Sequence, residues 1–119
     1  MTFDVEVVLK GRDFAVTEAV TIPQADPEHW TDSTVRAVLI EVLRAVDHVQ
    51  NPGGEGRLIA LRGFSWIVDG PDGAVVIAIE IPTGAAVAGP FKITQKLLDE
   101  MITRVLQQDR QQVAPQTIH

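Results

Sequence analysis

The sequence predicts a single α+β domain over residues 1–119, with a four-stranded, mainly antiparallel sheet and two helices packed on one face. Three observations support this fold class: apolar residues that alternate with the strand period, two apolar stripes with the helical period, and an internal similarity between residues about 3–50 and about 59–110. At an offset of 59 residues, ten of the 42 residues from 5 to 46 are identical to their partners. The chain therefore reads as a tandem duplication of one strand–strand–helix unit, ββαββα.

Each half begins with a predicted hairpin. Residues 3–9 (FDVEVVL) alternate between apolar and polar side chains, as in a strand with one buried face. The partner strand covers about Phe14–Ile22 with Phe14 inward, and Glu18 interrupts its inward apolar pattern. In the second half, strands at about 64–69 and 74–82 flank the turn Gly-Pro-Asp-Gly, whose residues favour hairpins.

Each half ends in a predicted helix. Residues 31–33 (TDS) offer N-cap oxygens for the first helix, whose apolar residues recur at helical spacing up to the glycine-rich segment after residue 51. Residues 83–92 (TGAAVAGPFK) are predicted to form a loop, and the second helix follows Pro90, a residue favoured in a first turn. The tail, residues 111–119, has no clear pattern and is expected to be frayed.

The sheet face turned away from the helices is predicted to carry small and partly apolar residues. An uncovered face of this kind often binds a partner. Its members are Val8, Thr17, Ala19, Thr21, Ser65, Ile67, Val76, Ala78 and Glu80.

Composition excludes several classes of function. The chain has no cysteine, which rules out disulfides, thiolate nucleophiles and cysteine-ligated metals. Its net charge is −6 and its ten Lys and Arg residues are scattered, a composition that argues against nucleic-acid binding. No segment approaches the about 20 apolar residues that span a bilayer, and the N-terminal residues do not resemble a signal peptide. We expect a cytoplasmic protein with no membrane contact.

A duplicated fold would bring loops 24–33 and 83–92 to the same end of the sheet. The candidate ligand-binding residues are His29, Asp32, Arg57 and Lys92. A histidine among carboxylates can act as a base or metal ligand, but the signal is weak, because a solvated loop has the same composition. The segment before the second helix also lacks the Gly-Lys-Ser/Thr ending of a phosphate-binding loop. We predict no cofactor, no metal and no catalytic residue.

The absence of familiar catalytic motifs favours a non-enzymatic interaction or accessory protein, a small acidic homodimer that binds another protein. Candidate interface residues are Trp30, Ile40, Ala19 and Ala78. The alternative is a small-molecule binding protein or modest enzyme with its pocket at loops 24–33 and 83–92. The sequence leans against an enzyme and leaves both functions open.

Overall fold

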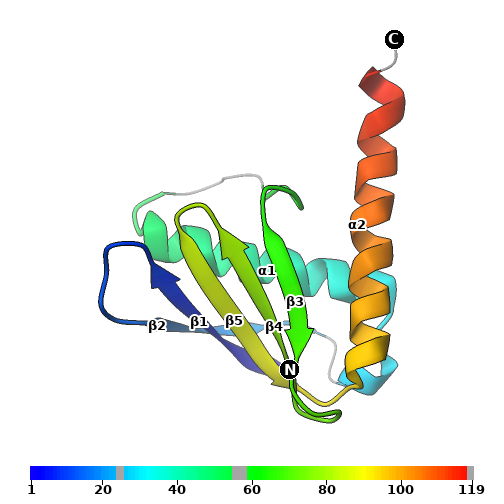
Figure 1. The fold of residues 1–119 in the computed structure, drawn as a ribbon, viewed down its shortest axis with the longest axis horizontal. Coiled ribbons are helices and arrows are strands. Elements are labelled where there is room, and N and C mark those ends of the chain that lie inside the picture. The colour runs from blue at the N-terminus through cyan, green and yellow to red at the C-terminus, as the bar shows by residue number, and fades with distance from the viewer. Residues whose placement is uncertain (24–25, 55–58, 118–119) are drawn as a thin grey trace.

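The computed structural model describes residues 1–23, 26–54 and 59–117. Five strands form one antiparallel sheet in the order β2-β1-β5-β4-β3, with two α-helices and a short 3-10 helix (Figure 1). The elements are β1 (Thr2–Leu9), β2 (Val16–Thr21), η1 (Pro27–His29), α1 (Asp32–Gln50), β3 (Ser65–Asp69), β4 (Val75–Ile81), β5 (Gly84–Phe91) and α2 (Gln95–Thr117).

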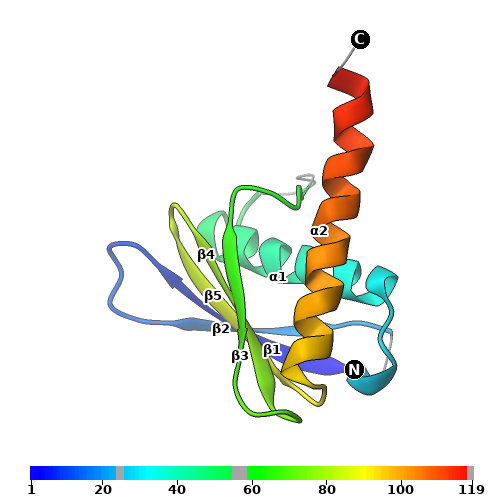
Figure 2. The same ribbon diagram turned by 45° about the vertical axis from the view of Figure 1, so that its right-hand side comes forward.

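The two helices lie on one side of the sheet. In Figure 1, α1 crosses behind the strands, and α2 stands beside β3 and runs on past the sheet; Figure 2 shows the same layers from the α2 side. α1 contacts β1, β2 and β5, whereas α2 contacts β3 and α1. The apolar residues buried between sheet and helices form one core cluster. The α+β class is therefore as predicted.

The first hairpin follows the predicted alternation, but its second strand is shorter than predicted. In β1 every second residue from Phe3 to Leu9 is buried. The last pair of the β1–β2 ladder is Val7 with Val16, so Phe14 lies in the connection, where 59% of its surface is exposed. The prediction that Phe14 points into the core was therefore wrong.

The prediction of four strands was also wrong, because residues 84–91 form the central strand β5 between β1 and β4. Glycine and alanine have low strand propensity, and the segment consequently resembles a loop in sequence. Its small residues fit a crowded position: Ala86 and Ala88 are at most 2% exposed in the core, and a Cβ at Gly84 would collide with the Val8 carbonyl.

The tandem duplication is not found in the structure. In the first hairpin the earlier strand, β1, is internal and β2 is at the edge, whereas in the second hairpin the earlier strand, β3, is at the edge and β4 is internal. The second half also has the additional strand β5. The offset similarity reflects the shared apolar periodicity of two strand–strand–helix segments and not a repeated arrangement.

Both helices begin at capping side chains. Thr31 caps α1, because its hydroxyl accepts a hydrogen bond from the Thr34 amide at 3.3 Å. α2 begins at Gln95, whose amide donates to Asp72 Oδ1 at 2.8 Å in the β3–β4 turn. Pro90 belongs to β5, so the prediction that it lies in the first turn of the second helix was wrong. The backbone continues as helix to Thr117, through most of the expected tail.

The close approach of β5 to β1 makes Gly84 sensitive to substitution. In Gly84→Ala the added Cβ would lie 3.0 Å from the Leu9 Cα in addition to its collision with Val8. We expect the free energy of unfolding to fall by about 1–3 kcal/mol. Urea denaturation is the measurement, and Gly53→Ala is the control, because a Cβ there would meet no atom within 4 Å. A Gly84→Ala protein as stable as this control would contradict the packing argument.

Candidate functional site

The most distinctive surface is the sheet face that neither helix covers, which we call the open face. It consists of the outward residues of all five strands, and its most exposed large apolar side chains are Ile67 (60%), Val87 (43%) and Val8 (40%). Val87 lies opposite Ala78, and Ala78 lies opposite Ile67, so three neighbouring strands present one apolar row. The predicted outward residues of this face all lie on it with exposed or half-buried side chains.

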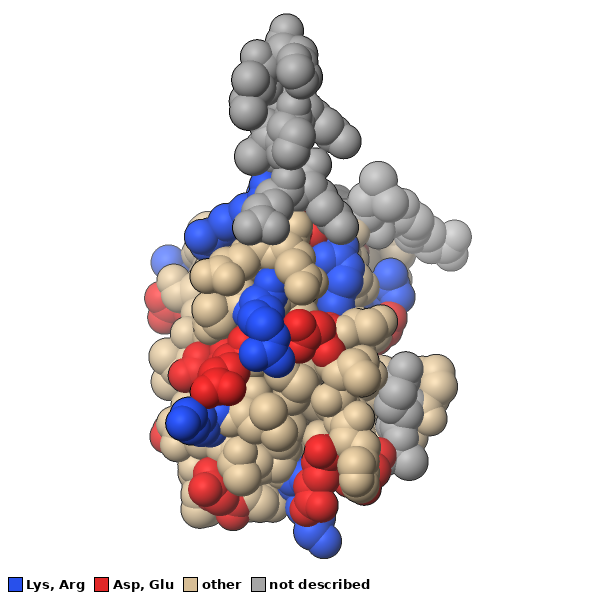
Figure 3. Space-filling view, turned by 90° about the vertical axis from the view of Figure 1, so that its right-hand side faces the viewer, with Lys and Arg blue, Asp and Glu red and all other residues tan. Residues whose placement is uncertain are grey.

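The open face is also acidic. From the sequence pattern, its residues are predicted only to be small and partly apolar. Asp4 and Glu6 of β1, Glu80 of β4 and Asp69 of β3 point outward from it. No Lys or Arg lies within the five described strands. By contrast, Figure 3 shows basic residues beside acidic ones on the α2 side. The open face therefore combines apolar side chains with an excess of negative charge, and Lys10 lies just beyond the end of β1.

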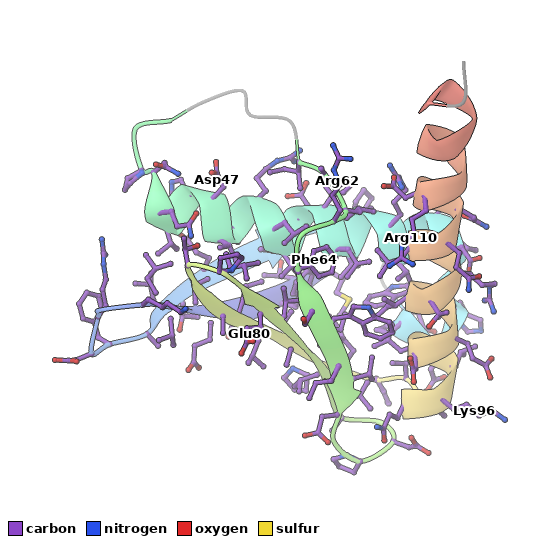
Figure 4. The ribbon with its side chains drawn as sticks, turned by 45° about the horizontal axis from the view of Figure 1, so that its top comes forward. Asp47, Arg62, Phe64, Glu80, Lys96 and Arg110 are labelled. Carbon is purple, nitrogen blue, oxygen red and sulfur yellow. The ribbon has the colours of Figure 1, made fainter. Side chains whose placement is uncertain are left out.

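Two hollows lie on the open face. The larger, about 730 Å³, is at the β4–β5 turn, and its lining includes Lys10, Phe64, Glu80 and Pro82. The smaller, about 280 Å³, lies over Ile67, Ala78 and Val87 and shares Ser65, Glu80 and Ala85 with the first. Phe64 precedes β3 and Glu80 lies on β4 (Figure 4). Together they form a shallow depression that is open to solvent.

His29 and Lys92 lie at the opposite end of the sheet, next to Asp26. His29 Nδ1 donates to Asp26 Oδ2 at 2.7 Å, and the His29 side chain is 80% exposed. This hydrogen bond and one from the Glu28 amide hold the pKa of Asp26 below its usual value, and the charge of nearby Lys92 acts in the same direction. A hollow of about 220 Å³ near this end is lined by Glu28, Gly73, Ile93, Thr94 and Leu97.

Asp32 has a structural partner. Its two carboxylate oxygens accept hydrogen bonds from Arg104 Nε at 2.9 Å and Nη2 at 3.0 Å, which ties the start of α1 to α2. These bonds lower the pKa of Asp32 and raise that of Arg104. Arg57 lies outside the described residues. Of the three candidate ligand residues that the structure describes, His29 and Lys92 lie near Asp26, whereas Asp32 is bonded to Arg104. Among the described residues no cluster of three His, Asp or Glu suits a metal ion.

The four candidate interface residues lie in different environments. Ala19 and Ala78 are on the open face, exposed and half-buried respectively. Ile40 is half-buried and packs against the core. Trp30 is only 6% exposed and contacts Phe91 edge to face, with ring centroids 5.1 Å apart. Trp30 therefore stabilises the core and is not available as a surface anchor.

Glu18, which interrupts the inward pattern of β2, has a partner on α1. Its Oε1 accepts a hydrogen bond from His48 Nδ1 at 2.7 Å. The pair fastens the edge strand β2 to the end of α1. The hydrogen bond from His48, 30 positions away on α1, explains why the edge strand tolerates the polar Glu18 at an inward position.

Sequence reasoning did not select Asp4 and Glu6 as site residues, although strand parity places them outward beside Val8. The missing information was the position of β5, which carries Ala85 and Val87 into the same face. Comparisons with protein-family models, curated proteins and solved structures found no match to this chain. No helix in the described part of the chain is long and apolar enough to cross a membrane.

The Asp32–Arg104 pair predicts a specific dependence of stability on pH. Because the pKa of Asp32 is lowered in the folded state, its stabilising contribution is complete above the unfolded value of about 3.9 and is lost as pH falls through the folded value. Asp32→Asn should therefore be less stable than the natural protein in urea at pH 7, and the difference should shrink progressively as the pH falls below about 4. Asp13→Asn, in the β1–β2 connection, is the control. A difference that persists unchanged in acid would contradict the assignment.

Proposed function

We propose that this protein is a non-enzymatic interaction protein, a small acidic homodimer of the cytoplasm that binds another protein on its open face. The observation that carries the proposal is the row of exposed apolar residues, Val87, Ala78 and Ile67, bordered by carboxylates without a basic residue among the strands. Burial of exposed apolar surface stabilises a complex by roughly 25 cal/mol per Å².

The negative charge of the open face favours a positively charged partner. Asp4, Glu6 and Glu80 would face a complementary surface rich in Lys or Arg, which increases the association rate and the specificity. The same carboxylates disfavour acidic partners and the stacking of two open faces of this chain. The partner we propose for this face is therefore a protein segment with both apolar and basic side chains.

Binding should be measured with defined peptides. A set of short peptides that combine Lys or Arg with Val, Leu or Phe is titrated into isotopically labelled protein, and the amide signals are followed by NMR. We expect shifts concentrated at Val8, Ile67 and Val87, and a weaker affinity at high salt, because exposed charges are screened beyond about 8 Å at physiological ionic strength. Acidic peptides of equal hydrophobicity should produce no such shifts.

Charge reversal on the open face provides the critical comparison. The double variant Glu6→Lys, Glu80→Lys should weaken binding of the basic peptides by about tenfold or more, since two favourable charge interactions become repulsive. The double variant Asp13→Lys, Asp99→Lys changes the net charge equally but lies off this face. Equal loss in both variants, or shifts located elsewhere, would contradict the proposed site.

A second function is favoured by one observation, the volume of the larger hollow. At about 730 Å³ it falls within the range of small-molecule sites, about 300–1,000 Å³. It lies at the β4–β5 turn and not at the predicted pocket between loops 24–33 and 83–92, since residues 84–91 form β5. A metabolite panel in a thermal-shift assay tests this function: a ligand at 100 times its dissociation constant adds about 2.7 kcal/mol of stability. Phe64→Ala should abolish any such shift.

A further inference from the structure

The sheet has two edges, and the backbone of β2 faces solvent along one of them. Met1 and Ile22 exchange both backbone hydrogen bonds, at 2.8 and 2.9 Å, which fixes the alternation along the β1–β2 ladder. Val16, Glu18 and Val20 therefore bond to β1, and the amides and carbonyls of the residues between them point outward. These outward residues are Thr17, Ala19 and Thr21.

The other side of β1 supports this assignment. The Lys10 amide donates to the Thr83 carbonyl at 2.9 Å, so the even-numbered residues of β1 bond toward β5 and the odd-numbered residues toward β2. In the part of the chain that the structure describes, no residue outside the sheet bonds to the outward backbone groups of β2. They are free to pair with another strand.

The edge formed by β3 is different. Its outward carbonyl at Val68 accepts a hydrogen bond from Gln95 Nε2 at 2.7 Å, and α2 stands beside the strand (Figures 1 and 2). The fold therefore covers part of the β3 edge with its own helix. The β2 edge receives no such cover on its outward side.

β2 also lacks most of the usual features that prevent edge-to-edge pairing, and its one inward charge is already paired within the chain. Exposed edges are commonly protected by lysine, proline, an inserted bulge or an inward charge. Within Val16–Thr21 there is no lysine, no proline and no register shift, and the one charged residue, Glu18, is paired with His48 on the helix side. The side chains that accompany the outward backbone groups are two threonines and an alanine.

We propose that β2 pairs with β2 of a second copy of this chain, antiparallel and about a two-fold axis at Ala19. This register places Thr17 opposite Thr21 of the partner subunit and Ala19 opposite Ala19 of the partner subunit. All three outward residues then form hydrogen-bonded pairs, with about six backbone hydrogen bonds in total. The open-face side chains that meet are small, uncharged and compatible with strands.

The neighbouring registers are less favourable. An axis at Glu18 would place Glu18 opposite Glu18 of the partner subunit, and like charges directly opposite are destabilising. An axis at Val20 would place Thr17 opposite Pro23 of the partner subunit, which has no amide to donate. The axis at Ala19 places Glu18 opposite Val20 of the partner subunit. Every outward residue of both β2 strands then has a partner for its backbone amide and its carbonyl.

The experiment compares Ala19→Pro with Ala19→Thr. Because the Ala19 amide points away from β1, proline removes two interchain donors per dimer without breaking the β1–β2 ladder. We expect the natural chain and Ala19→Thr to have twice the chain mass of 13.0 kDa by native mass spectrometry and light scattering. Ala19→Pro should retain the circular dichroism spectrum of the natural chain. Its dimer dissociation constant should rise by about thirtyfold or more. A natural chain that is monomeric at all concentrations, or a fully dimeric Ala19→Pro, would overturn the proposal.

Cysteine cross-linking tests the register independently of how Ala19→Pro folds. The chain has no cysteine, so a single introduced thiol reports one position only. Hydrogen-bonded pairs in antiparallel strands have Cα atoms about 5.5 Å apart, within the range of disulfides. Ala19→Cys should form a disulfide dimer rapidly, and Thr103→Cys, exposed on α2, should not. Equal rates for the two would exclude this interface.

This inference deepens the homodimer part of the proposed function and does not depend on the basic partner. A dimer that forms through β2 but binds none of the peptides would leave the inference standing and refute the proposed partner. A monomer whose open face still binds basic peptides would do the reverse.

Discussion

The structure depends on the pairing of β5 with both β1 and β4. β5 follows β4 directly, whereas β1 lies at the start of the chain, so this one strand joins the first hairpin to the second. The join is possible because Gly84 lets the backbone approach the Val8 carbonyl, and because Ala86 and Ala88 leave room for α1 above the middle of the sheet. Larger residues there would separate either the strands or the two layers. Small side chains are thus the condition for a continuous five-stranded sheet.

The same arrangement leaves one face and one edge of the sheet available. Both helices pack on the core face, and α2 turns toward β3, where Gln95 bonds to the Val68 carbonyl. Nothing in the described chain performs this role for β2, although Glu18 and His48 fasten that strand to α1 from the core side. The core face and the β3 edge are therefore used for stability, and the open face and the β2 edge are used for contact with other chains in the functions proposed above.

The sequence was informative where the pattern is local. The alternation in residues 3–9 and the apolar stripe of α1 depend on one face being buried, so both elements could be predicted, as could the outward position of Val8, Ile67 and Ala78. β5 could not be predicted, because its Gly and Ala residues have a weak strand pattern. These small residues are required by close packing against segments that are distant in sequence. The acidity of the open face could have been derived from the parity of Asp4 and Glu6. The free edge required the strand order, which sequence periodicity does not contain.

In the proposed dimer, the position of the axis has a consequence for the open face. Paired residues in an antiparallel ladder project from the same side of the sheet, so an axis at Ala19 runs along the sheet normal and places both open faces on one side. The carboxylates of β1 in each copy, Asp4 and Glu6, are then one strand away from the junction, and their field extends across it. A partner with two basic, apolar segments could occupy both copies at once, and the second contact would gain from the high effective concentration created by the first. The open-face side chains of β2, Thr17, Ala19 and Thr21, are uncharged, so no open-face carboxylate lies in the junction between the two acidic faces.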